Sequence, residues 1–222
     1  MARTAPQVDA RAPGRAGLDG RLVGAALACI ERWGVAKTTL EDVAREAGCS
    51  RATVYRAFPG GKRALLQAVA ASELAGLFDA LSSSLEAAED LEELLVAGIS
   101  RAAGWLQGRC ALKFLLAHEP ELVLPRGQGS GLDGLLRLAC DFAAPYLERY
   151  LGPDPSRRAA EWVARLVVSY TTCPAEGFDL AEADSARQLV RLFVLPGVRA
   201  MSAGAGAAVA AGGQAGWAGE GR

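Results

Sequence analysis

Side chains that hydrogen-bond to nucleic acids are concentrated in one short segment, RATVYRAFPGGK. Arg51 and Arg56 carry planar guanidinium groups that can pair with guanine, and Thr53 offers a methyl group to thymine. The phenol of Tyr55 and the ammonium group of Lys62 suit phosphate oxygens. These residue types predict recognition of double-stranded DNA rather than chemistry that makes or breaks bonds.

Catalytic patterns are absent from the rest of the sequence. There is no nucleophile elbow, no phosphate-binding glycine loop and no metal-ligand spacing, and His118 is the only histidine. The carboxylate pair Glu92-Glu93 falls on an expected solvated helix face. We therefore expect no enzymatic activity, no cofactor and no metal site.

The cysteines are scattered and odd in number: Cys29, Cys49, Cys110, Cys140 and Cys173. Without a C-x-x-C pair they indicate a reducing, cytoplasmic compartment. The first twenty residues contain no apolar signal segment, and no uninterrupted apolar run approaches the length of a membrane span, so we expect no membrane association. A thiol sensor acting through these cysteines stays open as an alternative.

Charge is distributed unevenly along the 222 residues. Residues 1–66 contain eleven Lys and Arg against six Asp and Glu, and the remaining residues contain thirteen against nineteen. A basic first part suits a polyanionic partner, although fluctuations of several charges also arise by chance. Hydrophobic residues make up 51% of the chain, which supports a substantial core.

The elements that position the DNA-reading side chains are three short helices. Apolar residues at spacings of three and four predict the first helix over residues 18–34, ended by a glycine. The segment TTLED is a capping-box signature for a second helix, which stops at Gly48. Ser50 caps a third helix, residues 51–58, which the following Pro-Gly-Gly breaks. Two helices joined by a tight turn form a helix-turn-helix pattern.

This region resembles the amino-terminal domain of the TetR family of regulators. The matching positions are Trp33-Gly34, Thr38-Thr39, Val43-Ala44, Ala47-Gly48, Ser50, Tyr55, Phe58 and Lys62. Cys49 and Ala57 depart from the usual pattern, and the connection before Lys62 is one residue longer than the commonest one. The resemblance implies that DNA is contacted by Thr39, Arg51, Thr53, Tyr55, Arg56 and Lys62.

The rest of the chain is also predicted to be helical, with no repeats and no sheet. The expected helices cover residues 63–81, 91–106, 111–117, 132–151, 157–172 and a last one that begins at Asp179 or Asp184 and ends near residue 195. Residues 125–131 are expected to form a mobile loop and residues 153–156 a turn. The predicted organisation is a disordered arm (1–17), a helix-turn-helix domain (18–66), a ligand-binding and dimerisation domain (67–200) and a disordered tail (201–222).

The resemblance implies that this second domain encloses a cavity and pairs with a second subunit. We expect an effector pocket among apolar residues with polar tips: Trp105, Phe114, Leu115, His118, Phe142 and Tyr146. A homodimer interface is expected along two strongly apolar helices, at Trp162, Leu166, Val167, Tyr170, Leu189 and Phe193. Both groups have a simpler explanation, which is packing within their own bundle.

The sequence therefore predicts an all-α transcriptional regulator, a repressor that a small lipophilic effector releases from an inverted-repeat operator. Two alternatives remain at this point. One is a thiol-based redox regulator, and the other is a small-molecule-binding protein that merely retains the fold.

Overall fold

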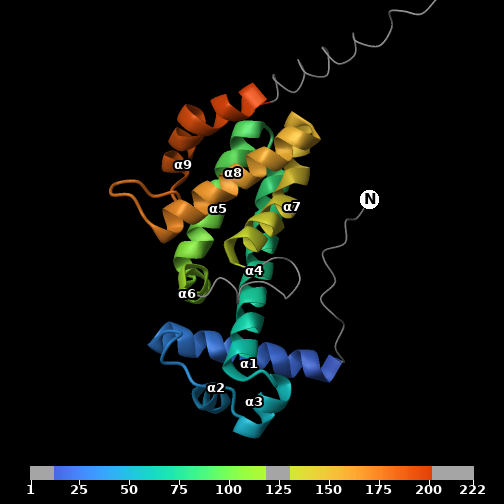
Figure 1. Cartoon of the computed structure of the whole chain (residues 1–222), viewed down its shortest axis with the longest axis vertical. Helices are drawn as coiled ribbons and strands as arrows, with labels where there is room; N and C mark the ends of the chain where they lie inside the picture. Colours follow the sequence, from blue (N-terminus) through green and yellow to red (C-terminus); the bar gives the residue numbers. More distant parts are fainter. Residues whose placement is uncertain (1–12, 119–130, 202–222) are drawn as a thin grey trace, which may run out of the picture.

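The computed structural model describes residues 13–118 and 131–201, and these residues are helical apart from short connections (Figure 1). The helices are α1 (Pro13–Trp33), α2 (Leu40–Glu46), α3 (Arg51–Ala57), α4 (Gly61–Ala87), α5 (Leu91–Gly108), α6 (Cys110–His118), α7 (Gly131–Leu151), α8 (Pro153–Thr172) and α9 (Ala183–Leu189), followed by a π-helical turn (Val190–Val194). The predicted all-α fold class is confirmed over these ranges. The remainder of the expected arm and tail, and most of the expected mobile loop, lie outside the described residues.

The first three helices form a small unit at one end of the molecule (Figure 1). Thr39 caps α2 in a reciprocal capping box with Asp42, and the hydroxyl of Ser50 accepts a hydrogen bond from the Thr53 N–H at the start of α3. Both caps satisfy backbone N–H groups that have no partner within their helix. Both were predicted, and both are confirmed. They fix where the two short helices begin.

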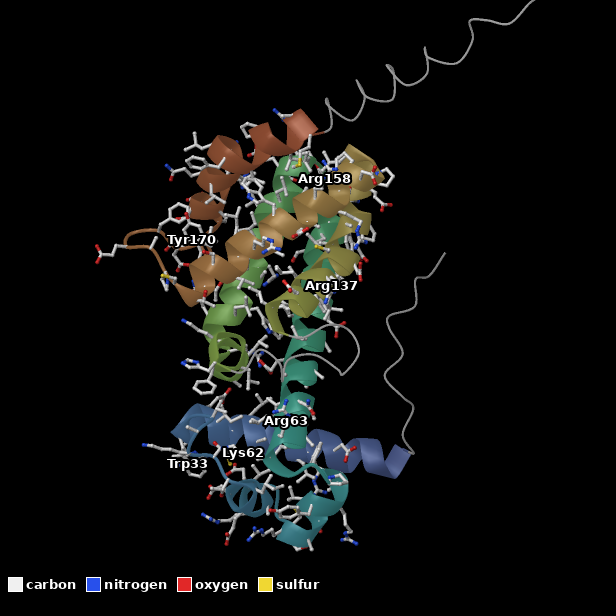
Figure 2. All side chains as sticks on the ribbon, in the orientation of Figure 1. Trp33, Lys62, Arg63, Arg137, Arg158 and Tyr170 are labelled. Carbon is white, nitrogen blue, oxygen red and sulfur yellow. The ribbon has the colours of Figure 1, made fainter. Side chains whose placement is uncertain are left out.

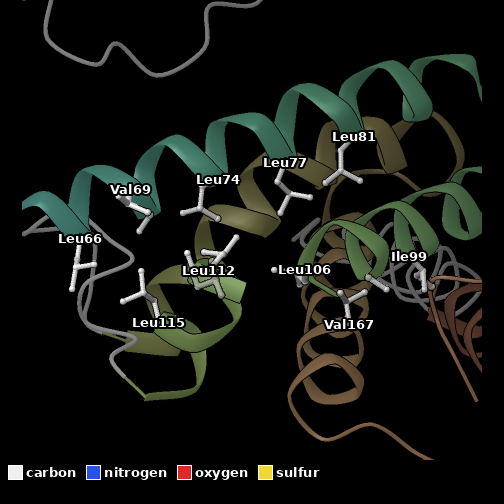
Figure 3. Close-up of a cluster of buried hydrophobic side chains, with 14 of the residues drawn as sticks. Leu66, Val69, Leu74, Leu77, Leu81, Ile99, Leu106, Leu112, Leu115 and Val167 are labelled. Carbon is white, nitrogen blue, oxygen red and sulfur yellow. The ribbon is translucent and has the colours of Figure 1, made fainter. Parts of the chain in front are cut away.

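Helix α4 rises from this unit into the upper bundle, so it belongs to both parts of the fold (Figure 1). Its buried side chains lie along one side, from Leu66 and Val69 near the first unit to Leu74, Leu77 and Leu81 in the bundle (Figure 3). Among the described helices, α4 alone is long and apolar enough to cross a membrane by length and composition. The core helix of a soluble protein meets the same criterion.

The upper bundle consists of α5 to α9 packed around the second half of α4. Helices α7 and α8 form a hairpin joined at Gly152, and α5 contacts α4, α8 and α9. Leucine, isoleucine and valine side chains from these helices meet in one core, including Ile99, Leu106 and Val167 (Figure 3). The arrangement leaves α8 and α9 on the outside of the subunit.

Several helices are longer than their sequence patterns predicted. Helix α1 begins at Pro13, inside the expected arm, because a proline is well tolerated in the first helical turn. Helix α4 continues six residues past the expected end because Leu85 is buried in the bundle. Helix α8 starts at Pro153 rather than residue 157, again with a proline at its first position.

The last helix also passes the point at which it was expected to stop. Residues 195–201 are helical although they include Pro196 and Gly197. The widened π turn at Val190–Val194 ends one residue before Leu195 and two before this proline. Such turns and prolines both interrupt the regular hydrogen-bond ladder. Burial of Val194, Leu195 and Val198 accounts for the continuation of the helix.

Candidate nucleic-acid interface and apolar cavity

The turn between α2 and α3 holds the two helices at a close crossing. Gly48 has a backbone φ of +64°, a left-handed conformation that a residue with a Cβ rarely adopts. On the inner side, Val43 and Val54 are fully buried and Phe58 is nearly so. Helix α3 is thereby fixed against α1 and α2 by its apolar face.

The opposite face of α3 presents the predicted DNA-reading residues to solvent. Arg51, Tyr55 and Arg56 are exposed, whereas Thr53 is half-buried. One nitrogen of the Arg51 guanidinium donates to the Tyr55 hydroxyl at 3.3 Å, and the guanidinium carbon lies 5.4 Å from the ring centroid. Arg56 donates to the Thr53 hydroxyl at 3.4 Å. Both arginine forks are therefore oriented on the helix surface before any partner binds.

Thr39, a predicted DNA contact, is also the predicted cap of α2. Its hydroxyl donates to Asp42 at 2.6 Å and accepts from the Asp42 N–H at 3.2 Å. The bonds from the Thr39 hydroxyl and backbone N–H, with Arg45 nearby, hold the pKa of the Asp42 carboxyl below its usual range. This threonine is exposed, on the same unit as the α3 surface.

Lys62, for which the sequence predicts a phosphate contact, makes hydrogen bonds within the protein. Its Nζ donates to the carbonyl oxygens of Val35 at 2.8 Å and Ala36 at 3.1 Å. These carbonyls belong to the connection between α1 and α2, so the lysine joins the first turn of α4 to that connection. The region around Lys62 and Trp33 can be followed in Figure 2.

The upper bundle contains an apolar cavity of about 130 Å³. It lies between α4, α5, α7 and α8, and the described residues that line it include no charged side chain. From α4 it is lined by Leu74, Leu77, Phe78, Leu81 and Leu85, and from α7 by Leu135, Ala139, Phe142, Ala143, Tyr146 and Leu147. The cavity therefore borders the same helix that begins at the unit formed by α1, α2 and α3.

Two of the six predicted pocket residues, Phe142 and Tyr146, line this cavity. The structure does not bring the other four to it. The ring of Phe114 stacks on that of His118 at 4.5 Å on α6, and Leu115 is fully buried in the core. The leucines of α4 were missed, although their recurrence every three or four residues is visible in the sequence.

Trp105 takes part in a separate polar cluster beside the cavity. The Arg109 guanidinium lies 4.4 Å from the Trp105 ring centroid, and one of its nitrogens lies 3.3 Å from a carboxylate oxygen of Glu73. The Glu73 side chain is only 4% exposed. Burial raises the pKa of the Glu73 carboxyl, while Arg109 acts in the opposite direction. A Cβ at Gly76 would lie 2.8 Å from the Trp105 ring, so a glycine is needed there.

The expected dimer residues divide into two groups. Trp162 and Phe193 are 37% and 65% exposed, and Leu192 beside Phe193 is 60% exposed. Leu166 and Tyr170 are half-buried. By contrast, Val167 and Leu189 are each 5% exposed, so their assignment to an intersubunit surface is corrected: they pack inside the subunit.

Burial disfavours the thiolate form of two cysteines. Desolvation raises the pKa of the Cys29 thiol, and it does the same at Cys140. Cys49 is half-buried at the helix-turn-helix corner, and Cys173 is exposed. Among the described cysteines, none forms a disulfide.

Comparison with known proteins gives a consistent result. The family model described as "Bacterial regulatory proteins, tetR family" matches residues 22–69. A helix-turn-helix-type transcriptional regulator of Mycobacterium bovis is 34% identical over 90 residues, which are 40% of this chain and 47% of the relative. The match thus spans about half the length of that curated relative.

Solved structures are similar over most of the chain. The TetR family repressor AlkX from a Dietzia strain, implicated in n-alkane biodegradation, superposes with a TM-score of 0.56 at 25% identity, covering 82% of this chain and 95% of AlkX. AibR, solved with isovaleryl coenzyme A and operator DNA, superposes with a TM-score of 0.54 at 15% identity, covering 80% of this chain and 98% of AibR. At that identity the second likeness concerns the fold alone.

Proposed function

Since the chain belongs to the TetR family of transcriptional regulators, we propose that it is a homodimeric repressor released from an inverted-repeat operator by a small lipophilic effector. The observation that carries the DNA-binding part is the division of α3 into two faces. Val54 and Phe58 fix it to the fold, while Arg51, Tyr55 and Arg56 face solvent. A rigid helix with exposed arginine forks suits the major groove.

We assign base reading to Arg51 and Arg56, with Thr53 and Tyr55 contributing to the same surface. Thr39, which caps α2, lies beside a phosphate in this proposal. Lys62 contributes by holding the α1–α2 connection through Val35 and Ala36.

The proposed dimer uses exposed apolar side chains of α8 and of the π-helical turn that follows α9. Trp162, Leu192 and Phe193 are large, and each exposes more than a third of its surface. Exposed apolar groups of this size favour a protein partner. A second copy would relate two α3 helices by a twofold axis, and the two must enter successive major grooves about 34 Å apart. The operator is therefore an inverted repeat.

The effector site in this proposal is the apolar cavity of about 130 Å³. Helix α4 lines it through Leu74 to Leu85 and begins beside α3 at Gly61. A ligand that changes the tilt of α4 changes the distance between the two α3 helices of a dimer. The neighbour AibR, crystallised with an acyl coenzyme A and operator DNA, supports a fold that accommodates both kinds of partner.

The test is selection of DNA fragments by the purified protein, followed by sequencing of the retained fragments. We expect an inverted repeat whose recovery requires Arg51 and Arg56. Sedimentation of the same sample should give a dimer. Retention of fragments without any shared sequence, or equal retention by an Arg51→Ala, Arg56→Ala double variant, would contradict the regulator proposal.

A further inference from the structure

The walls of the cavity restrict the charge of its ligand. No described lining residue is acidic or basic, and Tyr146 is the one described lining residue with a polar side-chain group. An ionised carboxylate placed there would lose its hydration without gaining a cationic partner, which strongly disfavours its binding. This environment selects uncharged molecules.

The size of the cavity and its aromatic wall restrict the ligand further. Its volume of about 130 Å³ is close to that of an engineered cavity of roughly 150 Å³ that binds benzene. The ring centroids of Phe78 and Phe142 are 4.5 Å apart, and those of Phe142 and Tyr146 are 5.5 Å apart. Three lining rings thus form a continuous aromatic wall. A single ring, or a chain with a similar number of carbons, fits beside it.

The hydrogen bonds around Tyr146 determine whether its hydroxyl donates to a ligand or accepts from one. Its hydroxyl donates to the Ser82 hydroxyl at 3.3 Å, and the Ser82 hydroxyl donates to the carbonyl oxygen of Phe78 at 2.9 Å. The proton of Tyr146 is therefore in use, while its oxygen retains lone pairs that can accept. A ligand hydroxyl can donate to this oxygen, whereas an ether oxygen cannot.

We propose that this cavity takes a compact, uncharged lipophile of about single-ring size, preferably with one hydroxyl that donates to Tyr146. The inference rests on the proposed function, in which the cavity is the effector site. It narrows that site to neutral hydroxylated molecules and excludes carboxylates of equal size.

Four probes that each contain one benzene ring test the proposal: toluene, benzyl alcohol, benzyl methyl ether and benzoate. Binding to the full-length protein is measured by calorimetry and by the rise in unfolding temperature. We expect toluene and benzyl alcohol to bind and benzoate to give no shift at concentrations that saturate with benzyl alcohol. Tyr146→Phe should weaken benzyl alcohol about three- to tenfold, leave toluene within about twofold, and remove the preference for the alcohol over the ether.

A matched pair of substitutions locates the binding. Ala164→Leu places extra carbons in the cavity and should abolish binding of both toluene and benzyl alcohol. Ala71→Leu adds the same atoms on the exposed side of α4 and should leave binding unchanged. Binding that survives Ala164→Leu, or benzoate binding as tightly as benzyl alcohol, overturns the proposal.

Operator binding separates this inference from the function on which it rests. A protein that retains operator DNA and ignores all four probes overturns the ligand class while leaving DNA recognition intact. A protein that binds the neutral probes as described, with operator affinity unchanged, supports the ligand class and contradicts effector release.

Discussion

Replacing Lys62 with methionine distinguishes two roles of this lysine, a contact with a DNA phosphate and a structural hydrogen bond within the protein. The two roles predict different results. The sequence pattern places Lys62 on a DNA phosphate, but its Nζ donates to the carbonyls of Val35 and Ala36. Hydrogen bonds from a charged donor contribute about 1.5–3 kcal/mol each when buried, and less near solvent. Because Ala36 and part of Lys62 are accessible, we expect Lys62→Met to destabilise the domain by about 1–2 kcal/mol. This corresponds to roughly 2–8 °C in unfolding temperature for a chain of this size.

DNA binding at several salt concentrations distinguishes the roles. The plot of log affinity against log salt concentration has a negative slope. Loss of one phosphate contact makes this plot less steep by about 0.9, whereas loss of a structural hydrogen bond leaves its steepness unchanged. We therefore expect Lys62→Met to lower affinity for all sequences with the wild-type slope. Lys37→Met is the matched control, because it removes the same charge from the exposed surface of the same connection. Its unfolding temperature should equal that of the wild type.

The structural role of Lys62 is refuted by one combination of results. If Lys62→Met unfolds at the wild-type temperature and its plot of log affinity against log salt concentration is less steep by about 0.9, the lysine contacts phosphate in the complex. The hydrogen bonds to the α1–α2 connection would then contribute nothing measurable. Fluorescence anisotropy with a labelled operator and thermal unfolding by circular dichroism supply both quantities.

Three further perturbations are predicted. Arg56→Ala should cost about 1–3 kcal/mol of preference for the operator over a scrambled duplex, and equal losses on both duplexes would assign Arg56 to phosphate instead. Trp162→Glu combined with Phe193→Glu should give folded monomers in sedimentation because both side chains are exposed; a surviving dimer would contradict the proposed interface. Glu73→Gln should raise stability at neutral pH relative to wild type and flatten its pH dependence. Burial raises the pKa of Glu73 in the folded state, so the buried carboxyl favours its protonated form. Glu73 therefore contributes to the stability of the wild type at low pH, and this contribution is lost as the pH rises through the raised pKa. Arg109 is 40% exposed and remains hydrated without its partner. Denaturant unfolding from pH 4 to 8 checks this, and a destabilised variant at pH 7 would show that the ion pair outweighs desolvation.

The fold was predictable where local signals act alone. The segment TTLED and Ser50 determine the starts of α2 and α3, because caps satisfy backbone groups within one turn. Ends that depend on tertiary burial were not predictable. Helix α4 extends to Ala87 because Leu85 packs in the bundle, and the last helix continues through Pro196 because Val198 is buried.

The cavity was predictable only in part, for a related reason. An aromatic side chain indicates a buried position but not which helix face meets empty space. Phe142 and Tyr146 face the cavity, whereas Trp105, equally aromatic, packs on Gly76 and Arg109. The cavity depends on how four helices diverge, and this divergence is set by side chains distant in sequence. The double hydrogen bond of Lys62 has no sequence signal at all, since its acceptors are backbone carbonyls.

The geometry of α4 explains why a small ligand suffices for the proposed release. Its 27 residues span about 40 Å at 1.5 Å per residue, and Leu77 lies about 22 Å along the helix from Lys62. A tilt of about 5° at Leu77 therefore moves the start of the helix by about 2 Å. Lys62 transmits this movement to the α1–α2 connection through Val35 and Ala36. Hydrogen bonds to bases weaken when donor and acceptor separate beyond about 3.2 Å. A displacement of 2 Å in each subunit of the proposed dimer thus breaks the base contacts of one half-site when the other is engaged, without any change within the helix-turn-helix unit itself.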